Sequence, residues 1–121
     1  MILSNTELQK IYFGVYRFEE TAEGYLQAFQ YNQEQMDYLE KTSDFWFERC
    51  NASTAKTLEF TTEATKISFD YQILWVGSED SFEICIDGLI TEIKYVKDLD
   101  KNGTITFDMP AGKKDVIVYL P

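Results

Sequence analysis

A run of acidic and amide side chains near residue 100 has the residue types of a calcium-binding loop. Asp98, Asp100 and Asn102 stand at alternate positions and Gly103 follows as the sixth residue, which is the spacing of an EF-hand loop. The twelfth residue of such a loop supplies a bidentate carboxylate, but Met109 stands there. We therefore expect Asn102 and Gly103 to form the tight turn of a hairpin. A weak cation site at Asp98, Asp100 and Asn102 stays open as an alternative.

Aromatic side chains could form a platform for a carbohydrate, because flat rings pack against the apolar faces of sugars. The candidates are Trp46, Tyr71, Trp75, Tyr95 and Tyr119. In a small domain most such rings fill the core, and Trp46, inside the apolar run 45–47, is expected there. Trp75 is expected at an edge or a loop, because it lies at the end of a predicted long strand. Trp75 and Tyr71 are therefore candidates for binding or for a domain contact.

The segment 47–53 contributes two further candidates. Arg49 stands where an apolar run gives way to polar residues, and guanidinium groups in such places often fix a carboxylate or a domain junction. A surface ion pair explains Arg49 equally well. Ser53 completes a glycosylation triplet with Asn51 and Ala52, which has meaning only in a secreted chain. We keep Arg49 and Ser53 as candidates for binding or for a domain contact.

The composition excludes several classes of function. The chain has 121 residues, of which 21 are acidic and 11 basic, so its formal net charge is −10, and it has no histidine. This charge repels phosphate backbones and anionic lipids, and we expect neither a nucleic-acid nor a membrane partner. Without histidine the chain has no Ser-His or Cys-His pair and no imidazole metal site. We expect no catalytic residue in this chain and no cofactor.

The N-terminal residues and the apolar segments predict a cytoplasmic location. The first residues lack the basic flank and apolar run of a secretory signal, and no apolar stretch approaches the roughly 18 residues that span a bilayer. Cys50 and Cys85 are therefore expected to be free thiols, because disulfides are rare in the reducing cytosol.

The elements that position these side chains are mostly strands, because β-branched and aromatic residues recur with a period of two from residue 11 onward. A capping box at Asn32 and Gln35 predicts a short helix at about 33–41. Segments 11–19 and 25–31 form a hairpin, with Phe13, Val15 and Phe29 as candidate core residues. The other strands are expected at 44–50, 57–62, 66–76, 82–86, 89–97, 104–109 and 115–120.

Two strands have an unambiguous buried face. Alternation places Ile67, Phe69, Tyr71 and Ile73 on one side of the strand 66–76. Phe82, Ile84 and Ile86 share a side of the next strand, and the dipeptide Asp87-Gly88 predicts an antiparallel hairpin to the strand that follows. These elements predict an all-β fold: a jelly-roll-like antiparallel β-sandwich with one short helix, forming a single domain over residues 1–121.

Four segments of the chain can be compared with known families: WFERCNASTAKTLEF at 46–60, KISFDY at 66–71, FEICIDG at 82–88 and KDVIVYLP at 114–121. Taken in this order, they resemble the N-terminal domain of bacterial SGNH (GDSL-type) esterases. The resemblance implies a jelly-roll-like sandwich that precedes an α/β catalytic domain of the same polypeptide, its expected partner. In that domain a Gly-Asp-Ser block carries the nucleophile and an Asp-x-x-His block supplies the acid and base. Neither block is in this chain, and neither Ser78 nor Ser81 has the context of the nucleophile.

The resemblance implies that the parent protein hydrolyses an ester, such as an acetyl ester on a carbohydrate, and that this domain packs on the catalytic domain and helps to shape its cleft. Two other roles stay open. One is a free-standing carbohydrate-binding module, suggested by the sandwich pattern and the aromatic residues. The other is an oligomerisation module that forms a homo-oligomer, suggested by the large apolar content of a small domain.

Overall fold

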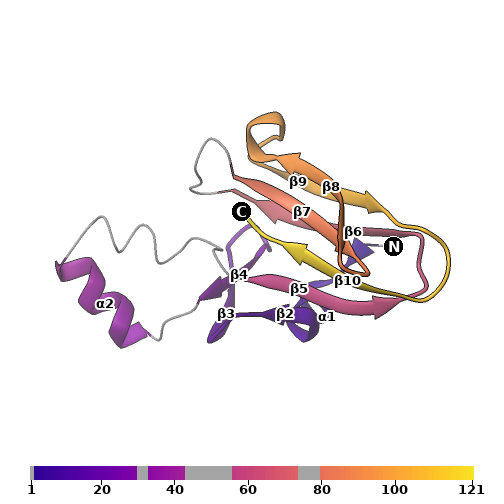
Figure 1. The fold of residues 1–121 in the computed structure, drawn as a ribbon. Helices are drawn as coiled ribbons and strands as arrows, with labels where there is room; N and C mark the ends of the chain where they lie inside the picture. Colours follow the sequence, from indigo (N-terminus) through magenta and orange to yellow (C-terminus); the bar gives the residue numbers. More distant parts are fainter. Residues whose placement is uncertain (1, 30–32, 43–55, 74–79) are drawn as a thin grey trace.

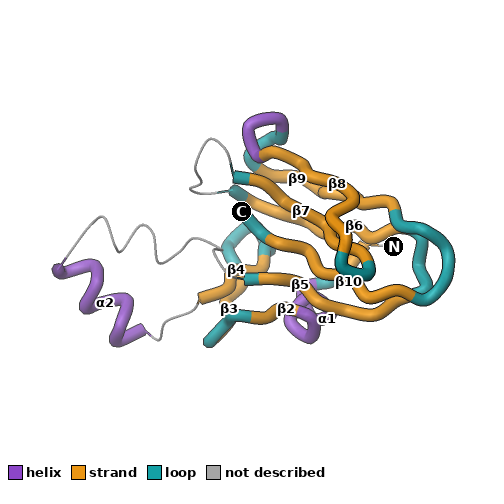
Figure 2. The backbone as a smooth tube through the Cα atoms, viewed as in Figure 1, coloured by secondary structure: helices purple, strands orange, loops and turns teal. Residues whose placement is uncertain are grey.

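The computed structural model describes residues 2–29, 33–42, 56–73 and 80–121, which form a β-sandwich with two short helices (Figure 1). The five-stranded sheet has the order β2 (Tyr12–Phe13), β5 (Thr57–Thr62), β10 (Lys114–Tyr119), β7 (Ser81–Ile86) and β8 (Leu89–Tyr95). The three-stranded sheet has the order β1 (Ile2–Leu3), β6 (Lys66–Gln72) and β9 (Asn102–Asp108). The chain crosses between these sheets after β1, β5, β6, β8 and β9, and the expected all-β sandwich is confirmed (Figure 2).

The sheets are antiparallel except at one edge, where β1 pairs in parallel with β6. The expected strands 57–62, 82–86, 104–109 and 115–120 agree with the observed ones to within two residues. The expected strand 44–50 and the last residues of the strand 66–76 lie outside the described residues. The end of the expected strand 89–97 is instead a single 3-10 turn, η1 (Val96–Asp98).

The predicted N-terminal hairpin is correct only in its second half. β3 (Arg17–Glu20) pairs antiparallel with β4 (Leu26–Phe29), and Gly24, at φ +89°, lies in the turn between them. The expected strand 11–19 is broken at Gly14, which has a φ of +81°, so Tyr12 and Phe13 join the five-stranded sheet instead. Of the three candidate core residues, Phe29 is buried as expected and Val15 is half-buried, whereas Phe13, which stands opposite Thr57 of β5, is exposed.

The helix expected at 33–41 is α2 (Gln33–Thr42), but a second helix, α1 (Asn5–Ile11), was not predicted. Ser4 caps α1 with the pattern Ser-x-x-Glu: its hydroxyl accepts the N–H of Glu7, and the Glu7 carboxylate accepts the N–H of Ser4. Leu8 of α1 is buried against the core. The expectation of one helix was therefore wrong, because a single buried leucine is too weak a pattern to reveal a helix of seven residues.

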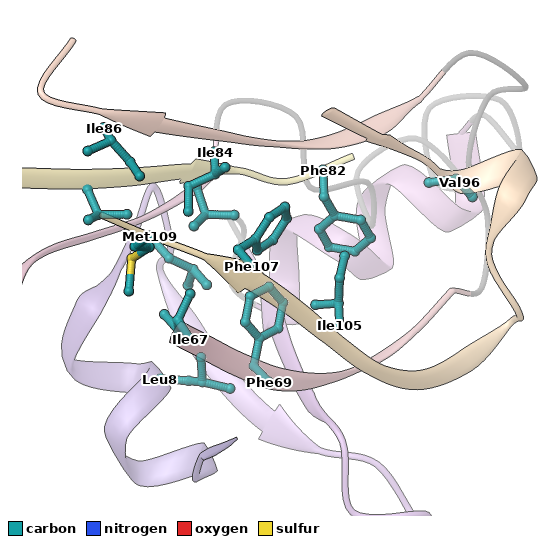
Figure 3. Close-up of a cluster of buried hydrophobic side chains, with 13 residues drawn as sticks. Leu8, Ile67, Phe69, Phe82, Ile84, Ile86, Val96, Ile105, Phe107 and Met109 are labelled. Carbon is teal, nitrogen blue, oxygen red and sulfur yellow. The ribbon is translucent and has the colours of Figure 1, made fainter. Parts of the chain in front are cut away.

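The core lies between the two sheets. Figure 3 shows Phe82, Ile84 and Ile86 of β7 pointing toward side chains of β9 and β6, including Phe107 and Ile67. These residues alternate with outward ones, so the predicted buried faces of β6 and β7 are confirmed. Asp87 and Gly88, with φ values of +49° and +88°, form the predicted two-residue turn from β7 to β8.

Candidate functional site

The structure describes one of the four residues proposed for binding or a domain contact. Tyr71 lies on β6, whereas Arg49, Ser53 and Trp75 lie outside the described residues. Trp46 and Cys50 lie outside them as well. Cys85 is a buried free thiol. The geometry below is therefore built from Tyr71, from the acidic segment around residue 100, and from the outward faces of the sheets.

Tyr71 of the three-stranded sheet forms a hydrogen bond to the loop before β9. Its hydroxyl donates a hydrogen bond to the carbonyl oxygen of Asp100 at 2.9 Å. Its ring lies edge-on to Phe82, with the two ring centroids 5.7 Å apart, and it also lies beside Gly103, its partner on β9. The ring is half-buried under these contacts, which leaves it a structural contact rather than an open platform for a sugar.

Three influences raise the pKa of Tyr71 above its ordinary value of 10.0: burial, which is the largest, and the charges of Asp100 and Tyr25. Each of them disfavours the tyrosinate, because an anion would lose hydration and would face negative charge. The phenol therefore stays a neutral hydrogen-bond donor to the Asp100 carbonyl throughout the physiological pH range.

Replacing Tyr71 with phenylalanine is expected to lower the free energy of unfolding by about 1 kcal/mol at neutral pH, the net value of a typical hydrogen bond. The difference should shrink above pH 10. Folding raises the pKa of Tyr71, so the native state binds this proton more tightly than the unfolded state, and the wild type loses that stability as pH rises from the unfolded pKa through the folded one. Phenylalanine has no proton to lose.

Urea unfolding of the wild type and of Tyr71→Phe, at neutral pH and above pH 10, measures both effects. Tyr16→Phe is the matched control, because Tyr16 is an exposed tyrosine outside the strands. A stability difference between the wild type and Tyr71→Phe that is the same at both pH values would contradict the linkage.

The acidic segment does not form the predicted hairpin turn. Asn102 and Gly103 are the first residues of β9, where they pair with Gln72 and Tyr71. The connection from β8 must cross from one sheet to the other, so a two-residue turn is too short. Asp98 ends η1, and Asp100 lies in the following loop. Among the described residues, no three or more His, Cys, Asp or Glu side chains are grouped so that they could hold a metal ion.

An apolar row on the outer face of the five-stranded sheet was missed by the sequence reasoning. Directly opposed residues of paired strands share a face. The strand registers place Phe13, Thr57, Tyr119, Glu83 and Ile93 in one line across all five strands. The side chains of Phe13, Tyr119 and Ile93 are 51%, 43% and 42% exposed. Three of the five strands thus contribute a large apolar side chain to solvent on this line.

A second row runs parallel to the first and extends the apolar surface. Ile117 of β10 stands opposite Cys85 of β7, which in turn stands opposite Ile90 of β8. Ile90 is exposed and Ile117 is half-buried. We call these two rows, residues 13, 57, 83, 85, 90, 93, 117 and 119, the outer apolar face. Alternation alone does not reveal it, because apolar residues on both sides of a strand look like a buried strand in the sequence.

A small cavity of about 330 Å³ lies beside α1. Its walls are mostly apolar, and the charged side chains of Glu7, Lys10 and Lys66 are also part of its lining. Two of these charges already have partners: Glu7 caps α1, and Lys66 lies 3.6 Å from Asp108. The cavity is thus an opening between the helix and the sandwich, with no convergent set of polar groups to orient a ligand.

No protein-family model matches the sequence, and no curated protein sequence matches it. None of the helices in the described ranges is long and apolar enough to cross a membrane. Among solved structures, the chain is similar to a salicylyl-acyltransferase from a tetracycline biosynthetic pathway, with a TM-score of 0.71 and 24% sequence identity. The match covers 91% of this chain and 32% of that protein. The similarity shows a shared fold, and this chain spans about a third of the acyltransferase's length.

Proposed function

We propose that the chain is a non-catalytic β-sandwich domain of an enzyme that hydrolyses or transfers an acyl ester. The observation that carries the proposal is the unequal coverage of the structural match: nearly the whole chain corresponds to about a third of an acyltransferase. In this proposal the chain is one domain of a longer polypeptide, and the other, larger domain is an SGNH-type catalytic domain.

The two sources of support concern the same chemistry. Ester hydrolysis and acyl transfer both proceed through a tetrahedral intermediate whose oxyanion must be stabilised, and they differ only in whether water or another hydroxyl accepts the acyl group. The sequence segments resemble an esterase accessory domain, and the structural neighbour is named as an acyltransferase. The proposal therefore commits to acyl esters and leaves the acceptor to be measured.

This chain supplies a surface rather than the reaction. It has no histidine to act as a general base for a serine nucleophile. Its outer apolar face combines exposed Phe13, Tyr119 and Ile93 on one side of a rigid sheet. Apolar surface of this kind is characteristic of contacts with another domain or protein. In the proposal, the catalytic domain packs on this face.

The coding sequence downstream of residue 121 provides the first test. A Gly-Asp-Ser block followed later by an Asp-x-x-His block would support the proposal, and a stop codon directly after Pro121 would overturn it for this gene. The encoded protein should hydrolyse or transfer an acyl ester. Replacing Tyr119 with lysine should impair its activity, whereas Tyr16→Lys, at an exposed tyrosine away from the outer apolar face, should not.

A carbohydrate-binding module is the second candidate, because Phe13 and Tyr119 place exposed aromatic rings on the same line of the sheet. Titration of the isolated chain with a panel of glycans distinguishes the two functions. Saturable binding that is lost in Tyr119→Ala and kept in Tyr16→Ala would favour the carbohydrate-binding module. Flat titrations together with a downstream catalytic domain would favour the accessory domain.

A further inference from the structure

The outer edge of β8 has the properties of a pairing surface. β8 is the last strand of the five-stranded sheet, and in the described part of the chain its partner is β7, on the other side. It has seven residues without proline, and Leu89, Ile90, Ile93 and Tyr95 are exposed. An edge of this length presents a row of backbone N–H and C=O groups that another strand can pair with.

The backbone groups available for pairing can be assigned from one hydrogen bond. The N–H of Val96, directly after β8, donates to the carbonyl oxygen of Asp80, directly before β7. Backbone groups of an antiparallel strand point alternately to its two sides. The groups of Val96, Lys94 and Glu92 therefore face β7, whereas those of Tyr95 and Ile93 face away from it. Ile93 can donate to and accept from a strand on the free side.

We propose that β8 pairs antiparallel with β8 of a second copy of this chain, with the two-fold axis at Ile93. Two identical edge strands that pair about a two-fold axis are antiparallel. A residue that lies n positions before the residue on the axis then stands opposite the residue n positions after it in the second copy. Ile93 then faces Ile93 of the second copy in a hydrogen-bonded pair. Glu92 faces Lys94 of the second copy, and Lys94 faces its Glu92, so the contact contains two opposite-charge pairs.

The charge pattern selects this register. An axis at Glu92 would oppose the two glutamates and would need backbone groups that face β7. An axis at Thr91 would place Glu92 opposite Ile90, and an axis at Tyr95 would place Lys94 opposite Val96, so the charges would have no partner across the strands. With the axis at Ile93, Glu92 and Lys94 occupy non-hydrogen-bonded pairs, in which opposed side chains are closest.

Inward-pointing charge on an edge strand can prevent pairing, because a lone lysine would be trapped against the neighbouring sheet. Here Lys94 Nζ lies 3.2 Å from Glu92 Oε2 of the same strand and 5.6 Å from the centroid of the Phe107 ring. The two charges therefore neutralise each other before the second copy arrives. In the dimer, Glu92 and Lys94 each face a second side chain of opposite charge. The side chains that β10 contributes to the outer apolar face, Ile117 and Tyr119, stay uncovered.

Sedimentation velocity on the intact chain tests the proposal, at about 0.15 M salt, where screening limits the long-range repulsion between two acidic copies. The wild type is expected to dimerise. Glu92→Lys and Lys94→Glu should each raise the dimer dissociation constant at least about tenfold, since two opposed pairs become repulsive. An equimolar mixture of these two variants should recover the wild-type affinity, because every opposed pair in the mixed dimer is again of opposite sign.

Glu63→Lys and Lys101→Glu are the matched controls, because they change the net charge equally at exposed positions outside β8. Circular dichroism verifies that every variant is folded. The proposal is wrong if the wild type stays monomeric at its highest soluble concentration, or if the controls weaken the dimer as much as the β8 variants. It is equally wrong if the mixture fails to recover affinity, or if only Tyr119→Lys, on the outer apolar face, removes the dimer.

Discussion

Replacing Phe107 with alanine is expected to lower the free energy of unfolding by about 3–5 kcal/mol, which is the range for deleting a buried aromatic side chain. Phe107 is 0% exposed, and its ring lies among side chains of both sheets (Figure 3). The alanine leaves a cavity between layers that cannot close without moving a strand. Since a domain of this size is stable by only about 5–15 kcal/mol, the variant should be partly unfolded in mild denaturant.

Tyr16→Ala is the matched control for Phe107→Ala. Tyr16 is 66% exposed and lies outside the strands, so its truncation removes little buried surface. The expected change is within about 0.5 kcal/mol, as for other surface substitutions. Urea denaturation followed by far-ultraviolet circular dichroism gives both values. A loss below about 1 kcal/mol for Phe107→Ala would contradict the position of this ring in the core.

Strands with one clear buried face were predictable, because the period-two pattern directly reflects which side is buried. β5, β6, β7 and β10 begin within one residue of their predicted starts. The turn at Asp87-Gly88 was predictable for a different reason: both residues adopt positive φ, which that dipeptide favours. An exception on β6 is Ser68, which is buried although alternation places it outside. It exchanges a hydrogen bond with Thr106 at 2.8 Å, which satisfies its hydroxyl.

Features that depend on distant partners were not predictable. Gly14 ends one strand because Tyr12 and Phe13 pair with β5, more than forty residues away in the chain. Asn102 and Gly103 have the composition of a turn, but they extend β9 because β6 offers them a pairing edge. The short β1 likewise exists only through its parallel pairing with β6. The sequence of a segment alone does not show which distant strand has a free edge with which that segment can pair.

The candidate site was only partly predictable for the same reason. Tyr71 was selected as an aromatic side chain for binding, but its hydroxyl and ring are engaged with Asp100 and Phe82. The outer apolar face is assembled from β2, β5, β10, β7 and β8, and its rows become visible only once the registers of these strands are known. Of its exposed members, Tyr119 alone was among the aromatic candidates. Which side chains share a surface of the sheet thus depends on strand order and register, and no local motif shows either of them.

Replacing Lys56 with methionine is expected to lower the free energy of unfolding by about 1.5–3 kcal/mol, the value of a hydrogen bond that involves a charged group. Lys56 is 1% exposed, and its Nζ donates to the carbonyl oxygen of Ala28 on β4 at 3.2 Å. Its own carbonyl accepts the N–H of Leu120 at 3.4 Å. Lys56 therefore joins the β3–β4 hairpin to the five-stranded sheet. Methionine keeps a long apolar stem but cannot donate to Ala28.

The loss should be concentrated in the hairpin, which distinguishes this role from general packing. Amide hydrogen exchange at Leu26–Phe29 should accelerate in Lys56→Met more than exchange at Val118, because the hairpin loses a tie to the sandwich while the sheet keeps its ladders. Lys113→Met, at an exposed lysine before β10, should change neither the exchange nor the stability by more than about 0.5 kcal/mol. Equal stability of the two variants would show that the bond to Ala28 contributes nothing. Uniform acceleration across the sandwich would show instead that Lys56 acts through the core, because the hairpin would then open together with the sheets.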